Sequence, residues 1–280
     1  MTAPTFVSST NTTYSTTSPQ TTASIAVQSG DVLVATGFGA NAFTGTNTTI
    51  SISTASGSTS AWTLLENASW PPATNQYAYI QTWSATATAT GNITVTFTRG
   101  AGSSVSVQIQ GIVKVWRNSG GIGAHAHNDN GAAGSSAPTI NVTTTGANSA
   151  LDYSSDDWND TTGTATFTAS VGTPVSDLID QTDPTGAFNY SFHVVDSGAA
   201  GAKTMGMSAP ATQRWVATVV EVLGPTVAPS VSAQILPQAK MPAGFLGPQA
   251  RRVAQYQYAL PAVAAPVVTG GSTLPTMGVG

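Results

Sequence analysis

Hydrophobic and polar residues alternate with a period of two along most of the chain. In the segment 105–115, Val107, Ile109 and Val113 fall on one side of an extended backbone, and Ser and Gln residues fall on the other. The segment 92–98 repeats the pattern with Ile, Val and Phe against three Thr. This period predicts strands with one buried face, because successive side chains of a strand point to opposite sides.

Further strand-length runs are separated by turn residues such as Ser29-Gly30, Pro71-Pro72 and Asp183-Pro184. No window favours an amphipathic helix, and the nearest candidate is 173–180. About ten or eleven short strands are typical of an antiparallel sandwich or jelly roll, so we predict an all-β, jelly-roll-like antiparallel β-sandwich. The additional runs are 23–27, 31–35, 49–53, 62–65, 77–84, 139–143, 164–168, 190–195 and 215–223.

The alternation also predicts which side chains form the core. We expect Thr94, Thr96 and Thr98 to be exposed, since they alternate with the large apolar residues of their strand. The predicted buried set is Val32, Val34, Trp62, Leu64, Ile93, Val95, Phe97, Val107, Ile109, Val113, Val115, Tyr190, Phe192, Val194, Val220 and Val222.

Composition changes after Gly224, which predicts a body at 1–224 and a Pro-rich arm at 225–280. The arm holds eight of the sixteen Pro, no Asp or Glu and three basic residues, so it is positive while the body is negative. Pro-rich sequence favours an extended backbone, and the arm has more large apolar residues than a free linker. We expect it to be ordered on a partner subunit. The assembly residues are Phe245, Leu246, Arg251, Arg252, Tyr256, Tyr258 and Leu260.

The overall composition excludes several classes of protein. Only 7% of residues are charged, about a quarter are Ser or Thr, and the net charge of -4 disfavours a nucleic-acid partner. With no Cys, disulfides and thiolate sites are excluded. Residues 1–30 have neither a basic segment nor a long apolar run, so we expect no secretory signal, and no stretch is apolar enough for a membrane helix.

Few residues offer catalytic or metal chemistry. His125 and His127 would lie on one side of an extended chain, as a metal pair requires, but no third ligand is evident, and we expect both to be solvated in a Gly-rich loop at 120–134. We expect His193 on the outer face of a strand. We therefore predict no metal and no cofactor.

The acidic residues gather in one segment. Asp152, Asp156, Asp157 and Asp160 fall within nine residues, a possible calcium loop that lacks the EF-hand spacing, and we expect a solvated connection after a strand ending near Tyr153.

Hydrolase signatures are missing. No Gly-x-Ser-x-Gly elbow and no phosphate loop occurs, and Glu221 reads as a carboxylate at a strand end, whereas paired Asp leave a glycosidase formally open. We predict that the protein is not an enzyme.

Several blocks of the body resemble a family of jelly-roll virion proteins of tailed phages infecting actinobacteria, described as minor tail proteins. The resemblance lies in the order and spacing of the blocks across 5–224, does not cover the arm, and implies a structural role without catalytic residues. The blocks are Ser29–Ala35, Ala61–Leu65, Tyr79–Ala85, Gly91–Phe97, Val113–Arg117, Asn141–Leu151, Phe188–Val195 and Arg214–Val222.

Two functions from different classes follow. In the first, the protein is a subunit of the virion, made in the host cytoplasm, in the tail or as a capsid decoration, with copies of itself and other virion proteins as partners. In the second, it is a carbohydrate-binding module that contacts the host envelope through exposed aromatic residues. Whether those aromatics line a groove or fill the sandwich distinguishes the two. They are Trp70, Tyr77, Tyr79 and Trp158.

Overall fold

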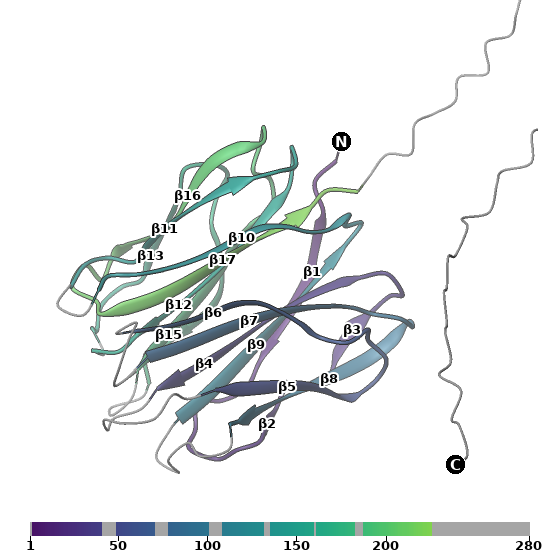
Figure 1. Ribbon diagram of the computed structural model, residues 1–280, viewed down its shortest axis with the longest axis horizontal. Helices are drawn as coiled ribbons and strands as arrows, with labels where there is room; N and C mark the ends of the chain where they lie inside the picture. The colour runs from purple at the N-terminus through teal and green to yellow at the C-terminus, as the bar shows by residue number, and fades with distance from the viewer. Residues whose placement is uncertain are drawn as a thin grey trace, which may run out of the picture. The chain divides into compact units, whose positions relative to one another are not determined.

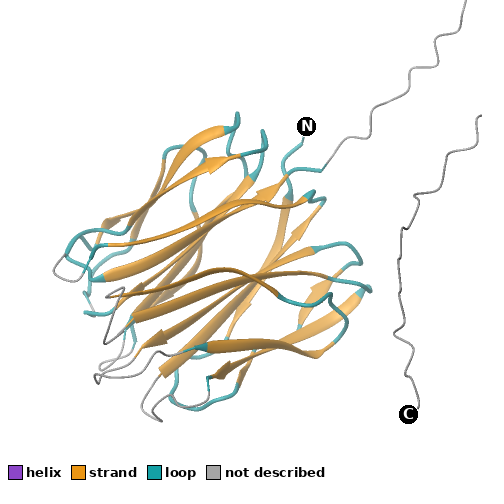
Figure 2. Cartoon of the chain, viewed as in Figure 1, coloured by secondary structure: helices purple, strands orange, loops and turns teal. Residues whose placement is uncertain are grey.

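The computed structural model describes residues 2–40, 49–70, 78–100, 108–131, 135–159, 161–182 and 187–225. These residues form seventeen strands and no helix, joined by loops and turns (Figure 2). All strand pairs are antiparallel. The predicted fold class, all-β with antiparallel sheets packed as sandwiches, is confirmed. The residues of the arm after Pro225 lie outside the described residues, so the boundary at 224 stays a prediction.

The first half of the chain forms two sheets. One is five-stranded, with the order β1-β9-β4-β7-β6, and in the other β2, β3 and β5 all pair with β8. The strands are β1 (Thr5–Asn11), β2 (Gln20–Thr21), β3 (Ile25–Val27), β4 (Val32–Ala40), β5 (Ile50–Ser56), β6 (Thr63–Trp70), β7 (Ala78–Thr86), β8 (Gly91–Arg99) and β9 (Gln108–Arg117).

The second half also forms two sheets, with the orders β10-β17-β12-β15-β14 and β11-β16-β13. Its strands are β10 (Gly121–Asp129), β11 (Thr139–Thr144), β12 (Ala150–Asp157), β13 (Thr166–Ala169), β14 (Val175–Asp180), β15 (Phe188–Val194), β16 (Gly201–Ala209) and β17 (Trp215–Leu223).

The two halves have the same strand order. Counting β2 and β3 as one interrupted strand, β1 to β9 correspond in sequence to β10 to β17, and both sheets of one half map onto those of the other. Register shifts recur at equivalent pairs, including β6 with β7 and β14 with β15. Both β8 and β16 also begin with a Gly of positive φ, Gly91 and Gly201. The strands between Thr5 and Leu223 therefore form two copies of one structural repeat.

The four sheets stack as four layers, with the two five-stranded sheets in the middle (Figure 1). One apolar cluster, which includes Phe97 and Val113, fills the sandwich of the first half, and another, which includes Tyr153 and Phe192, fills that of the second. A third set, around Trp116, lies between the five-stranded sheets. Here β10 lies against β6, while Phe6 of β1 stacks on His193 of β15.

Most of the predicted core residues are buried. The exceptions are Leu64, which is 46% exposed on the edge strand β6, Trp62, which is partly buried, and Val107, which lies outside the described residues. The three Thr of β8, predicted to be exposed, are half-buried. The prediction for Leu64 was wrong because β6 is the edge strand of its sheet, where a neighbouring strand covers a side chain on one side only.

We expect residues 1–224, expressed without the arm, to unfold cooperatively with a β-type circular dichroism spectrum. The reason is that every core cluster of the described residues is made by side chains that precede Pro225. Thermal denaturation followed by circular dichroism measures this. A truncated protein without a cooperative transition would show that the arm completes the core.

Candidate functional site: a buried charge cluster between the two halves

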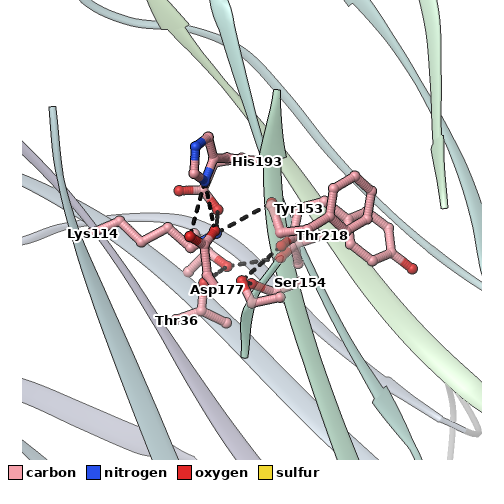
Figure 3. A network of polar contacts seen from close by, with 11 residues as sticks. Thr36, Lys114, Tyr153, Ser154, Asp177, His193 and Thr218 are labelled. Carbon is pink, nitrogen blue, oxygen red and sulfur yellow. Dashed lines mark hydrogen bonds and ion pairs between the residues drawn. The ribbon is translucent and has the colours of Figure 1, made fainter. Parts of the chain in front are cut away.

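Four ionisable side chains meet between the five-stranded sheets. Lys114 comes from β9 of the first half, and Asp152, Asp177 and His193 come from β12, β14 and β15 of the second. We call these four residues the charge cluster. Lys114 Nζ lies 2.7 Å from Asp152 Oδ1 and 2.8 Å from Asp177 Oδ2, and His193 Nδ1 lies 2.9 Å from both oxygens of Asp177. Figure 3 shows Lys114, Asp177 and His193 pointing toward one another from their separate strands.

The charge cluster is sealed from solvent. The side chain of Lys114 is 1% exposed, and those of its two Asp partners are 3% exposed. Phe6 stacks on the His193 ring with 3.9 Å between the ring centroids, and Trp116 packs edge-on against the same ring with 5.4 Å between the centroids. Buried charges are tolerated only when they are paired and hydrogen-bonded, so the arrangement depends on all its members.

Burial and mutual attraction shift the protonation of the cluster in different directions. Burial raises the pKa of Asp152, and Lys114 offsets this only in part. Burial also acts to raise the pKa of Asp177, but Lys114 and His193 hold that pKa below its ordinary value. For Lys114, burial acts to lower the pKa, yet the two carboxylates raise it above its usual range. Asp177 is therefore the carboxylate that most strongly favours its charged form.

Neutral hydroxyl and amide groups continue the polar contact between the halves. Thr82 Oγ1 lies 2.9 Å from Thr218 Oγ1 and 3.1 Å from Thr36 Oγ1, so one chain of hydroxyls crosses from one five-stranded sheet to the other (Figure 3). Farther along, Asn189 Nδ2 donates to Gln110 Oε1 at 2.9 Å. The interface is thus zoned into polar and apolar patches, which favours one register of the two halves.

The charge cluster occurs once, although the fold repeats. By strand register, Val34 pairs with Lys114, and at the equivalent place in the second half Asp152 pairs with Val220. Lys114 and Asp152 therefore stand where the other half carries valine. The repeat thus offers two equivalent pairs of positions. Lys114 and Asp152 occupy one pair and form an ion pair, whereas Val220 and Val34 occupy the other.

Sequence reasoning placed His193 on a solvated outer face, and this prediction was wrong. The ring is 2% exposed, because the face that alternation assigns to water is covered by the first half. Residues 188–194 alternate strictly between apolar and polar side chains, so this strand carries no local signal that its polar face is covered. Lys114, by contrast, lies in the denser apolar run 112–116, which is typical of a strand buried on both faces.

The predicted acidic loop is also corrected. Asp152, Asp156 and Asp157 belong to β12 and are buried, while Asp160 lies outside the described residues. Strand alternation places Asp152 toward the first half, and Asp157 closes the end of β12. The segment is a central strand with polar residues directed into an interface, and it is not a solvated connection.

Asp157 accepts backbone N–H groups from Asn159, Thr161 and Arg214, which ties the end of β12 to the start of β17. Burial raises its pKa to about 6, although these hydrogen bonds act to lower it. Its carboxyl therefore binds a proton in the native state between about pH 4 and 6, where the unfolded chain has already released it.

We expect Asp157→Asn to remove a pH dependence of stability. Relative to the variant, the wild-type free energy of unfolding falls by roughly 2–3 kcal/mol as the pH rises from about 4 to about 7, because burial penalises the carboxylate. Urea denaturation of both proteins at the two pH values measures the difference. A difference that stays constant with pH would contradict this assignment.

The remaining predicted residues fall outside the charge cluster. His125 and His127 lie on β10, where a loop was expected, and their Nδ1 atoms each contact one oxygen of Glu66 on β6. They thus join the two halves at the opposite edge of the interface. Among the residues that the structure describes, no group of three or more His, Asp or Glu is placed to hold a metal ion.

Glu221, predicted as a carboxylate at a strand end, is fully buried near the end of β17. It accepts backbone N–H groups of Ala124, Thr145 and Gly146 at 2.8–3.1 Å and the Ser149 hydroxyl at 2.7 Å. Burial acts to raise its pKa, but these donors hold the pKa below the ordinary value. Its carboxylate has all its contacts within the fold and serves structure.

The aromatic residues proposed for sugar binding mostly fill the interior. Trp70 and Tyr79 are 3% and 4% exposed, Trp158 packs partly buried against the cluster of Trp70, and Tyr77 lies outside the described residues. The predicted assembly residues, from Phe245 to Leu260, likewise lie outside them.

No helix among the described residues is long and apolar enough to cross a membrane.

Comparison with known proteins adds no relative. The chain matches no protein-family model, no curated protein and no solved structure with which it was compared.

Proposed function

We propose that the protein is a non-enzymatic structural component of a bacteriophage particle, a minor tail protein whose arm at 225–280 fastens it to copies of itself and to other virion proteins. The observation that carries this proposal is the strand order, found in both halves. The resemblance of the body to phage minor tail proteins supplies the class of particle.

We further propose that each half is a jelly roll. In an eight-stranded jelly roll, the first, eighth, third and sixth strands form one sheet, and the second, seventh, fourth and fifth form the other. The second half has β10-β17-β12-β15 and β11-β16-β13 in these places, with its fifth strand, β14, added to the edge of the first sheet. Jelly rolls build viral capsid and lectin domains, so the topology is compatible with a particle subunit. Fold likeness alone does not establish function, and the arm supplies a second line of support.

The outer sheets offer faces suited to close packing. Thr94 and Thr96 of β8 bond to hydroxyls of neighbouring strands, and Thr204 of β16 bonds to Asn141 of β11. Such faces carry hydroxyl groups in place of ions. Subunits that meet through them avoid the desolvation cost of buried charge.

The arm has the composition of a fastener. The arm carries three basic residues and no acidic residue, while the body carries five basic and twelve acidic residues, and these opposite net charges favour docking of the arm on the body of a neighbour. Its apolar anchors include Phe245, Tyr256 and Leu260, and full burial of one such side chain stabilises by roughly 1.5–3 kcal/mol.

Particles assembled with the full chain or with residues 1–224 test this function. We expect the full protein in purified particles, located on the tail by electron microscopy with a labelled antibody, and the truncated protein to remain soluble and unincorporated. Normal incorporation of the truncated protein would refute the fastening role of the arm. Absence of the full chain from particles would refute the virion role itself, and a signal over the head would make it a capsid decoration.

The carbohydrate-binding alternative has less support. Trp70 and Tyr79 are buried and cannot stack on a sugar without unfolding the core around them. We therefore propose no sugar-binding role for these residues.

A further inference from the structure

The nearest groups of Lys114 and Asp152 are placed for a covalent reaction. Nζ lies 2.7 Å from Asp152 Oδ1, and the backbone carbonyl of Phe192 accepts a second hydrogen bond from Nζ at 3.2 Å. The amine is therefore held on two sides against one carboxyl group. Holding two reactants in this way replaces an encounter in solution with a step inside the fold.

A second carboxylate is available for proton transfer. Asp177 Oδ2 lies 2.8 Å from Nζ, and both of its oxygens are held by His193 Nδ1. By contrast, Asp152 Oδ2 is buried and has no hydrogen-bond partner among the described residues. The two Asp therefore differ. Asp177 is a proton acceptor fixed by His193, and Asp152 has one oxygen that receives no hydrogen bond from the described residues.

We propose that Lys114 and Asp152 condense into an intramolecular amide, an isopeptide bond that joins β9 of the first half to β12 of the second, with Asp177 as the group that carries the proton. Nothing in this proposal depends on the role in a phage particle.

The reaction balances without any added reagent. The Lys114 ammonium passes one proton to Asp177, and the neutral amine attacks Cγ of the protonated Asp152 carboxyl group, forming the C–N bond. Asp177 gives that proton to the departing hydroxyl group and takes a second proton from the nitrogen, the C–O bond breaks, and one water molecule leaves. No atom is oxidised or reduced, and Asp177 ends in its protonated form, hydrogen-bonded to His193.

The surroundings favour the condensed product. Burial raises the pKa of Asp152, which increases the share of its reactive acid form. The amide replaces a buried cation and a buried anion by a neutral group, so the desolvation penalty of both ions disappears. Phe6 and Trp116, packed on His193, keep the site dry, and this opposes the reverse hydrolysis.

The bond would link the halves where the hydrophobic contact between them is interrupted by charge. It would connect positions that are 38 residues apart in the chain and that belong to different sandwiches. Separation of the halves would then require breaking a covalent bond. His193 acts here as a positioning residue, since it contacts Asp177 and not the reacting atoms.

Mass spectrometry of the full-length, denatured protein tests the proposal. We expect an intact mass lower than that of the sequence by one water molecule. Trypsin cuts after Lys and Arg, so it should fail to cut after the acylated Lys114 and should release residues 100–117 joined to 118–203. Fragmentation of the joined peptide should place the link at Asp152.

Variants assign the roles of the residues. Lys114→Met and Asp152→Ala should each restore the full mass expected for their sequences, whereas the matched control Lys203→Met on β16 should keep the loss of water. Asp177→Asn should reduce the linked fraction at least tenfold at a fixed time after synthesis, with the fold checked by circular dichroism.

The wild-type measurement is decisive even where a variant fails to fold. A wild-type mass equal to that of the sequence, with cleavage after Lys114, would overturn the proposal. A link mapped to Asp177 would overturn the assigned acceptor, and a link that forms at the wild-type rate in the folded Asp177→Asn protein would overturn the proton relay.

Discussion

Replacing Lys114 by Met lowers the free energy of unfolding by roughly 3–5 kcal/mol, because it leaves Asp152 and Asp177 buried without their cation. If Lys114 is joined to Asp152 by the amide proposed above, the variant instead loses that covalent link and leaves Asp152 as a buried carboxyl group without a partner amine. Methionine nearly fills the volume of the lysine stem, so the effect reports charge more than packing. Chemical denaturation of the full chain measures it.

Two comparisons make this result specific. Lys203→Met, at a partly buried site on β16, should change stability by no more than about 0.5 kcal/mol. The double variant Lys114→Met/Asp152→Leu should recover part of the loss, because apolar residues often replace a buried ion pair without penalty. Equal stability of Lys114→Met and the wild-type protein would show that water reaches the charge cluster.

Glu221→Ala should also lower the free energy of unfolding by about 3–5 kcal/mol. The change strands the backbone N–H groups of Ala124, Thr145 and Gly146, and each buried donor left unpaired costs about 1–3 kcal/mol before any relaxation. Urea denaturation at neutral pH measures the loss.

A graded variant separates the hydrogen bonds from the loss of volume. Glu221→Gln keeps one acceptor oxygen and nearly the same size, so it should lose less than Glu221→Ala. Gly123 allows β10 to approach this carboxylate closely, because a Cβ at that position would overlap Glu221 Oε2. If Gln and Ala cost the same, the carboxylate does not hold these donors.

Glu221 and the charge cluster occupy different positions in the repeated strand order. By strand register, Glu221 pairs with Leu151, and Val115 pairs with Leu33 at the equivalent place of the first half. Lys114 and Asp152 likewise have valine as their counterparts. The shared backbone therefore carries different polar sites in each half, and the halves are no longer interchangeable.

Alternation predicted most of the strands, but it missed β1, β2, β10, β14 and β16 and ended the strand that is β12 too early, near Tyr153. Among the missed strands, β1, β10 and β16 are rich in Ser, Thr, Gly or Ala. Three of the missed strands, β1, β10 and β14, lie at the edge of a five-stranded sheet, where few large apolar side chains are needed. The segment nearest to a helix in pattern, 173–180, contains β14.

The polar site was hidden for a related reason. Lys114 and His193 stand at positions that alternate with apolar residues, which in a two-layer sandwich would face water. In this protein those positions face the other half, at 1% and 2% exposure. A period of two identifies two faces of a strand, but it does not tell whether the second face meets solvent or another sheet.

The sequence by itself determined the class of fold, most of the inner core and the change of composition after Gly224, since these depend on local period and residue type. Only the tertiary structure decided that the chain repeats one strand order twice, that the two larger sheets pack against each other, and that Lys114 meets Asp152 and Asp177. The physical reason is that these contacts join residues distant in sequence through the register of whole sheets, and register is fixed by packing across layers rather than by any short segment.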